Sequence, residues 1–194
     1  MLGWASRMPN ARSTPPDPDL ARLAEVLKER SVLKGTFTLA SGRTSRYYLD
    51  CRRTTLDPEG ATLVGRCILD LVDREGIRPG AVGGLTLGAD PIAAAMAILS
   101  WQAGRPIPAL IVRKAAKDHG TGKRIEGWLP QGSEALIVED VVTSGGSSLD
   151  AIAAVEAAGA RVAAVVAIVD REEGGAKALE KYRFYSLFRA DELL

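Results

Sequence analysis

Residues 136–148 read Leu136-Ile137-Val138-Glu139-Asp140-Val141-Val142-Thr143-Ser144-Gly145-Gly146-Ser147-Ser148, an apolar strand followed by two acids and a turn rich in glycine and hydroxyl groups. The paired glycines let the backbone approach a phosphate, and the helix expected after them adds the positive end of its dipole. Two acids beside a phosphate site need a hydroxylated group or a metal between them. Ribose hydroxyls and Mg²⁺ both meet that need, so the stretch predicts a site for a phosphorylated ribose.

Other glycine-rich turns fit this stretch less well. No Gly-Lys-Ser/Thr follows, as a nucleotide-binding P-loop requires, and the third glycine and later acid of a dinucleotide fingerprint are missing. A turn that serves only for packing remains the alternative, but it gives no reason for the acids and the hydroxyl side chains.

The chain on either side of this stretch alternates between short apolar runs and helical patterns. Continuous apolar runs indicate strands that are buried on both faces. The expected strands are 81–85, 109–112, 135–138 and 162–169, and the expected helices between them are 89–103 and 147–158. Such alternation predicts an α/β fold with a mainly parallel central sheet flanked by helices, whose ligands bind at the carboxyl ends of the strands.

The N-terminal part predicts a smaller unit. Residues 1–19 are proline-rich near their end and are expected to form a flexible arm, followed by a helix over 20–30 with Asp19 as its N-cap. Short strands at 36–39 and 47–49 suggest a hairpin hood, and a helix from 57 to 72 starts the core. We expect one domain over 20–194, with the hood at about 20–55 and the core at about 56–175.

Composition limits the partners of the chain. Its 25 Lys and Arg balance 24 Asp and Glu at a net charge of +1, so no global field favours nucleic acid or an anionic membrane. No apolar run is long enough to span a bilayer, and a cytoplasmic location is expected. Cys51 and Cys67 are too few for a disulfide framework and lack the spacing of a metal site.

A second segment is dense in cations and glycines. Residues 113–127 follow a strand and contain Arg113, Lys114, Lys117 and the only histidine of the chain, His119. Such a run is often only a solvated face. Its glycines also permit a hinged lid whose cations stabilise charge on a departing diphosphate.

These two segments carry a resemblance to a known family. Residues 136–148 resemble the signature with which type I phosphoribosyltransferases hold 5-phosphoribosyl-1-diphosphate (PRPP). Residues 113–127 resemble the catalytic loop of the orotate phosphoribosyltransferases through Arg113, Lys114, Lys117, His119-Gly120 and Glu126-Gly127. The resemblance extends over about 20–171, including 37–43 and Tyr47-Tyr48 in the hood, and it implies the type I phosphoribosyltransferase fold.

The resemblance implies roles for individual residues. Lys117, His119 and Asp140 are the implied catalytic residues, and Thr143 and Arg171 are expected to bind orotate. The implied PRPP-binding residues are Arg113, Lys114, Lys117, His119, Glu139, Asp140, Val141, Val142, Thr143, Ser144, Gly145, Gly146 and Ser147. Mg²⁺ is expected to bind mainly through PRPP, without a protein metal site of its own.

Three further expectations follow from the same resemblance. The chain is expected to form a homodimer in which Lys117 and His119 reach the neighbouring subunit's site. Residues 83–90 resemble the family's diphosphate loop, where a cis peptide at Thr86-Leu87 is expected. Ala40 and Leu87-Gly88 stand where some members have cationic residues, so the site is expected to be poorer in cations.

The implied reaction converts orotate and PRPP to orotidine 5′-monophosphate and diphosphate, a step of pyrimidine synthesis. Two alternatives stay open: the acceptor is a purine or another base, or the chain is a regulator that senses PRPP without catalysis. The role of His119, as a phosphate ligand or a proton carrier, is also open.

Overall fold

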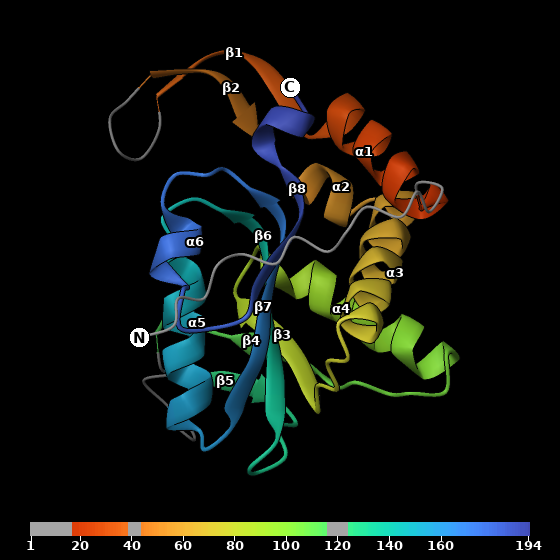
Figure 1. Ribbon diagram of the computed structural model, residues 1–194, viewed down its shortest axis with the longest axis vertical. Helices are drawn as coiled ribbons and strands as arrows, with labels where there is room; N and C mark the ends of the chain where they lie inside the picture. Colours follow the sequence, from red (N-terminus) through yellow and green to blue (C-terminus); the bar gives the residue numbers. More distant parts are fainter. Residues whose placement is uncertain (1–16, 39–43, 116–123) are drawn as a thin grey trace, which may run out of the picture.

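The structure is a computed structural model that describes residues 17–38, 44–115 and 124–194. Its main sheet has the strand order β5-β4-β3-β6-β7-β8 (Figure 1). The four central strands are β3 (Ala81–Leu85), β4 (Ala109–Val112), β6 (Glu134–Val142) and β7 (Arg161–Asp170), and they run parallel. At the edges, β8 (Phe184–Arg189) is parallel to β7 and β5 (Ile125–Gly127) is antiparallel to β4.

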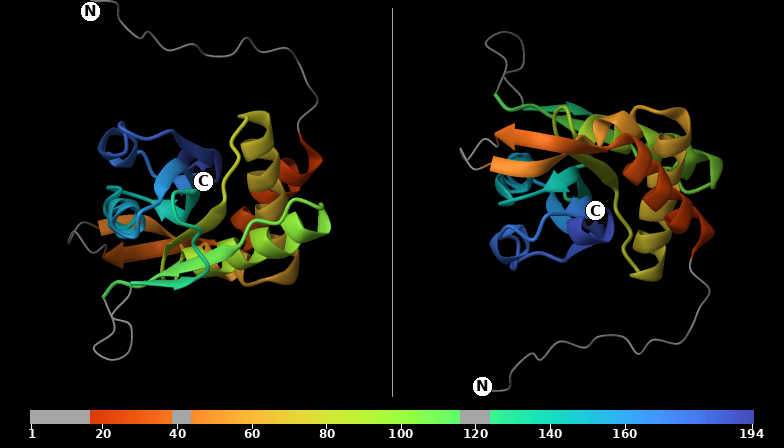
Figure 2. Two further views of the ribbon diagram at one scale, coloured as in Figure 1. Left: turned by 90° about the horizontal axis from the view of Figure 1, so that it is seen from below. Right: turned by 90° about the horizontal axis from the view of Figure 1, so that it is seen from above.

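Helices cover both faces of this sheet. On one face lie α1 (Pro18–Arg30), α3 (Pro58–Arg74) and α4 (Ala89–Gln102), and on the other lies α5 (Gly146–Ala157), as two further views also show (Figure 2). Each face has its own apolar core, one centred on residues such as Leu23, Ile68 and Met96 and the other on Ile152 and Val155. The arrangement confirms the predicted α/β fold with a mainly parallel sheet flanked by helices.

A two-stranded hairpin forms the hood. Strands β1 (Val32–Thr38) and β2 (Thr44–Leu49) pair antiparallel, with an irregularity between Lys34 and Phe37. Figure 1 shows the hairpin above the end of the sheet where β6 leads into α5. The short helix α2 (Arg52–Thr55) then returns the chain to the core.

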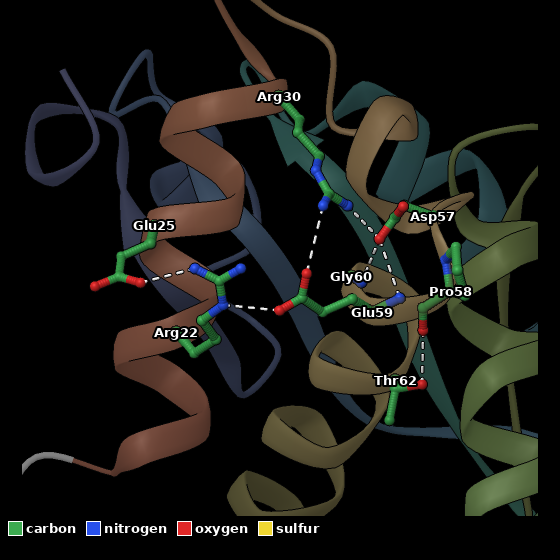
Figure 3. A network of polar contacts seen from close by, with 8 residues as sticks. All are labelled: Arg22, Glu25, Arg30, Asp57, Pro58, Glu59, Gly60 and Thr62. Carbon is green, nitrogen blue, oxygen red and sulfur yellow. Dashed lines mark hydrogen bonds and ion pairs between the residues drawn. The ribbon is translucent and has the colours of Figure 1, made fainter.

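A polar network joins α1 to the start of α3 (Figure 3). Asp57 caps α3 by accepting hydrogen bonds from the backbone N–H groups of Glu59 and Gly60, both at 3.0 Å. Arg30 forms an ion pair with Asp57, and Arg22 Nε donates to Glu59 Oε1 at 2.7 Å. Pro58 at the first helical position needs no N–H partner, so the sequence favours a helix start at this point.

The elements that position the site were predicted most closely. Strands 81–85 and 109–112 have the predicted bounds, while β6 and β7 extend beyond the predicted 135–138 and 162–169. The first helix starts earlier than expected because the Asp17 side chain, not that of Asp19, accepts the capping hydrogen bond, from the Asp19 N–H at 3.0 Å. Both hood strands are also longer than predicted.

Several short or peripheral elements were not predicted. They are α2, β5, β8, α6 (Gly175–Ala178) and the 3₁₀ helix η1 (Ala190–Glu192). The single turns of helix are too short to show a helical period, and β5 has only three residues at the sheet's edge. Within the described residues, every helix is too short or too polar to cross a membrane.

Candidate active site

The turn between β6 and α5 forms a small hollow. It has a volume of about 50 Å³ and is lined by Glu139 and residues 141–148. Gly145 has a φ of 83°, a left-handed conformation that glycine adopts without steric cost. The start of the 12-residue helix α5 adds its dipole and its unpaired N–H groups. A compact hollow of this kind suits a phosphate group.

A larger cleft of about 570 Å³ adjoins this hollow and lies at the carboxyl ends of β3, β4, β6 and β7. The end of the hood contributes one wall. Two other pockets on the surface have volumes of about 610 and 750 Å³, but neither includes the acids or the phosphate turn. The lining of the cleft comprises Tyr48, Leu49, Asp50, Arg52, Leu85, Thr86, Leu87, Gly88, Lys114, Glu139, Asp140, Val141, Thr143, Ser147 and Arg171.

Most of the predicted site residues therefore lie together. Lys114, Glu139, Asp140, Val141, Thr143, Ser147 and Arg171 line the cleft, and Val142, Ser144, Gly145 and Gly146 line the adjoining hollow. Arg113 lines neither, and its Nη1 lies 3.7 Å from Glu126 Oε1. Outside the described residues lie Lys117, His119 and Ala40, together with most of the lid expected around 115–125.

The two acids at the end of β6 are buried. Glu139 is 6% exposed, and its Oε2 has no hydrogen-bond partner among the described residues. Burial, together with the neighbouring Asp140 carboxylate, raises the pKa of Glu139 to about 8. Burial also raises the pKa of Asp140, opposed by the Val141 N–H that donates to Asp140 Oδ1 at 2.9 Å and by the charge of Arg52. A hydroxyl donor or a cation entering the cleft favours the ionised form of this pair.

Arg171 follows directly after β7 and is almost fully covered. Its side chain is 8% exposed, Nη2 lies 3.0 Å from Glu173 Oε1, and Nε has no partner among the described residues. The guanidinium lies 5.3 Å from the centre of the Tyr47 ring, so the hood and the core meet at this point. A buried guanidinium with an N–H left to donate is suited to a carboxylate.

The turn after β3 completes the cleft. Its Thr86–Leu87 peptide is cis, which confirms the expectation for this position. Thr86 Oγ1 donates to Asp90 Oδ2 at 2.6 Å. A Cβ added at Gly88 would lie 2.5 Å from Asp140 Oδ1, so a side chain at position 88 is incompatible with the observed place of this carboxylate.

Sequence reasoning missed the contribution of Asp50 and Arg52 to the cleft. Asp50 follows the second hood strand and Arg52 is the first residue of α2, and only the folding of the hood over the sheet brings them to the carboxyl ends of the core strands. The pair Asp50 and Arg52, two residues apart after a strand that ends near the site, is the one available signal.

The chain is similar to known proteins both in sequence and in fold. No family model matches the chain. The chain is 48% identical over 164 residues to the orotate phosphoribosyltransferase of Rhodopirellula baltica, covering 82% of this chain and 85% of the relative.

Two crystal structures of the orotate phosphoribosyltransferase of Mycobacterium tuberculosis H37Rv also resemble it. The one in complex with Fe(III) dicitrate is 43% identical with a TM-score of 0.81, and covers 91% of this chain and 99% of that one. The one in complex with PRPP is 40% identical with a TM-score of 0.76, over the same shares of the two chains.

Proposed function

The chain belongs to the orotate phosphoribosyltransferase family, and from this premise we propose how its own residues bind the substrates and support the reaction. The family's enzymes are pentosyltransferases (EC 2.4.2.10) of pyrimidine biosynthesis. They transfer the 5-phosphoribosyl group of PRPP to N1 of orotate and release orotidine 5′-monophosphate and diphosphate. One observation carries the proposal: a single cleft joins the acid pair, the phosphate turn, Lys114 and the buried Arg171.

The phosphoribosyl part of PRPP is assigned to the end of β6. The 5′-phosphate binds in the hollow lined by residues 141–148, where backbone N–H groups and the hydroxyls of Thr143, Ser144 and Ser147 donate. The ribose hydroxyls donate to Glu139 and Asp140. The partnerless Oε2 of Glu139 supports this assignment because a buried acceptor without a donor is costly until a ligand supplies one.

Orotate is assigned to the space between Arg171 and Thr143. The free Nε–H of Arg171 suits the carboxylate of orotate, and the Tyr47 ring that covers the guanidinium excludes water from that end of the cleft. A purine lacks this carboxylate, so the same residue argues against a purine acceptor.

Mg²⁺ fits the cleft as a partner of PRPP. No group of three or more potential protein ligands lies together in the described part of the chain, so the protein offers no complete cage. Mg²⁺ commonly keeps several waters and binds through one or two carboxylates together with substrate phosphates, and the acid pair matches that pattern. When bound there, Mg²⁺ neutralises charge on the departing diphosphate.

The reaction needs no protein nucleophile. N1 of orotate attacks C1 of the ribose as diphosphate leaves, and the acid pair lies next to the electron-poor ring that results. We assign Lys114, which lines the cleft, to the diphosphate; Arg113 lines neither the cleft nor the hollow and is given no contact with PRPP. Lys117 and His119 are assigned to the site of the neighbouring subunit in a homodimer, where they add charge and exclude water.

The first experiment follows the loss of orotate absorbance when purified protein is mixed with orotate, PRPP and Mg²⁺. Consumption of orotate by the wild type, slowed by orders of magnitude in Lys117→Ala, supports the substrate and the lid together. A screen with purine bases under the same conditions tests the alternative acceptor. A folded wild type that binds PRPP but converts no acceptor would instead indicate a regulator.

A further inference from the structure

The diphosphate end of the cleft is short of cations. Within the described residues, the basic side chains that line the cleft are Arg52, Lys114 and Arg171. Arg171 is held by Glu173 and covered by Tyr47 at the end proposed for the base. Diphosphate carries several negative charges. Apart from the Mg²⁺ and the neighbouring subunit's loop residues proposed above, Lys114 alone leaves part of that charge without a partner.

The turn after β3 cannot supply the missing cation. A side chain at Gly88 would collide with the Asp140 carboxylate, whose Oδ1 lies 2.5 Å from the added Cβ, and the neighbouring residue in the turn is the apolar Leu87. Position 40 in the hood is an alanine. Within the described residues, a second basic side chain for this end of the cleft must therefore come from another element.

Arg52 stands where such a cation is needed. It lines the cleft together with Thr86, Leu87 and Gly88, and its side chain is 45% exposed, so a ligand can reach it. Asp50 Oδ1 accepts from Arg52 Nε at 3.0 Å, which engages one edge of the guanidinium. In the described part of the chain Asp50 is its ion-pair partner, and the ηN–H groups remain for a ligand.

The backbone that carries Arg52 is firmly anchored. Cys51 and Thr54, on either side of Arg52 and Arg53, are 1% and 0% exposed. The Thr54 hydroxyl lies 2.7 Å from that of Ser31, and the Asp50 N–H donates to the Ser31 carbonyl at 3.0 Å. A guanidinium attached to such an anchored backbone is preorganised, which reduces the entropy lost when it binds an anion.

We propose that Arg52 is a PRPP-binding residue that holds the diphosphate end of PRPP together with Lys114, and that Asp50 positions its guanidinium. The proposal rests on the proposed function, because it assigns a part of the same cleft. A planar guanidinium can donate two parallel hydrogen bonds to neighbouring phosphate oxygens. The positive charge of Arg52 also opposes the rise in the pKa of Asp140, which supports its nearness to the acid pair.

The test compares Arg52→Gln with Arg53→Gln. Arg53 is the next residue of the same short helix and is exposed, but it does not line the cleft, so the two variants remove the same charge at matched positions. Titration calorimetry measures the binding of two probes, PRPP with Mg²⁺ and ribose 5-phosphate. Ribose 5-phosphate carries the 5′-phosphate but lacks the diphosphate.

Arg52→Gln is expected to weaken PRPP binding at least about tenfold, the factor for one charge-assisted hydrogen bond, and to leave ribose 5-phosphate binding unchanged. Arg52→Lys is expected to recover only part of the loss because it keeps the charge without the fork. Equal PRPP affinity in Arg52→Gln and Arg53→Gln overturns the proposal, as does an equal loss of ribose 5-phosphate binding in Arg52→Gln. A folded wild type that binds no PRPP contradicts the proposed function itself.

Discussion

Glu139 makes the stability of the free protein depend on pH. Its pKa is about 8 in the folded chain against 4.5 for an ordinary glutamate, so between these values the folded chain keeps a proton that the unfolded chain has lost. The free energy of unfolding should therefore fall as pH rises from about 5 to about 8 and level off above that. Glu139→Gln, which cannot ionise, should remove this part of the slope.

Urea denaturation of the unliganded protein across this pH range measures the effect. The exposed Glu180 provides the matched control, because Glu180→Gln makes the same chemical change outside the core. A difference between wild type and Glu139→Gln that stays constant from pH 5 to pH 8 would show that Glu139 is ionised throughout.

Arg171 should determine the affinity for orotate and not that for PRPP. Both Arg171→Gln and Arg171→Lys should raise KM for orotate at least about tenfold. Glutamine loses the positive charge, and lysine keeps the charge but cannot donate two parallel hydrogen bonds to a carboxylate. The KM for PRPP should change little. Arg161→Gln, at the opposite end of β7 with a side chain 72% exposed, is the control. An equal rise in both KM values would instead mean that Arg171 supports the cleft as a whole.

The residues of the site differ in whether the sequence alone could predict that they line the cleft. Asp140 and Thr143 were predicted from the motif at 136–148, and Arg171 was predicted from the resemblance to the family. All three line the cleft because the carboxyl ends of parallel strands meet at one edge. Arg52 was not predicted, because its place depends on how the hood lies over the sheet. Arg113 was grouped with Lys114 by the resemblance, but only Lys114 lines the cleft, and the Arg113 guanidinium lies 3.7 Å from Glu126.

Strand β3 depends on a residue without a side chain. A Cβ added at Gly84 would lie 2.1 Å from the Val138 carbonyl oxygen and 2.7 Å from the Ala89 Cβ, so β3, β6 and α4 would have to separate. Gly84→Ala should lower the free energy of unfolding by about 2–3 kcal/mol, the upper part of the range for overpacking. Urea denaturation at one pH measures this loss.

Comparing Gly84→Ala with Gly76→Ala distinguishes the effect of steric crowding on the free energy of unfolding from the effect of backbone strain. Nothing lies within 4 Å of a Cβ added at Gly76, but its φ of +65° is one that alanine adopts at a cost of about 1 kcal/mol. Gly84→Ala should therefore be the more damaging change, although alanine suits a strand better than glycine does. A smaller loss for Gly84→Ala than for Gly76→Ala would mean that the three elements move apart easily.

The two strands that escaped prediction, β5 and β8, both lie at an edge of the sheet. Strand β8 mixes Phe, Tyr, Ser and Arg, because as an edge strand it is only partly buried and needs no continuous apolar run. The central strands β3, β4, β6 and β7 have such runs and were predicted. Sequence periodicity reports burial, so it detects the centre of the sheet and loses its edges.

The molecule as a whole brings together a hood and a core that are separate in sequence. Tyr47 on β2 covers Arg171 after β7, and Arg22 and Arg30 on α1 bind Asp57 and Glu59 at the start of α3. These contacts place Tyr48, Leu49, Asp50 and Arg52 in the wall of the cleft. The parallel sheet could be predicted from local patterns, whereas this long-range closure could not, because no local pattern encodes which surfaces meet.

The proposed sharing of each site between two subunits can be tested by mixing two impaired variants, with orotate held well below its KM so that Arg171→Gln alone keeps at most about a tenth of wild-type activity. Arg171 lies in a subunit's own cleft, and Lys117 is assigned to the cleft of its neighbour. In a mixed dimer of Arg171→Gln and Lys117→Ala subunits, the cleft of the Lys117→Ala subunit keeps its own Arg171 and receives Lys117 from the other. Random exchange at equal concentrations should therefore restore about a quarter of wild-type activity, since half of the dimers are mixed and each has one intact site.

Mixing Arg171→Gln with Asp140→Asn should restore none, because both changes damage the cleft of their own subunit. If Lys117 instead acted within its own subunit, neither mixture would recover activity, and the shared site would have to be abandoned.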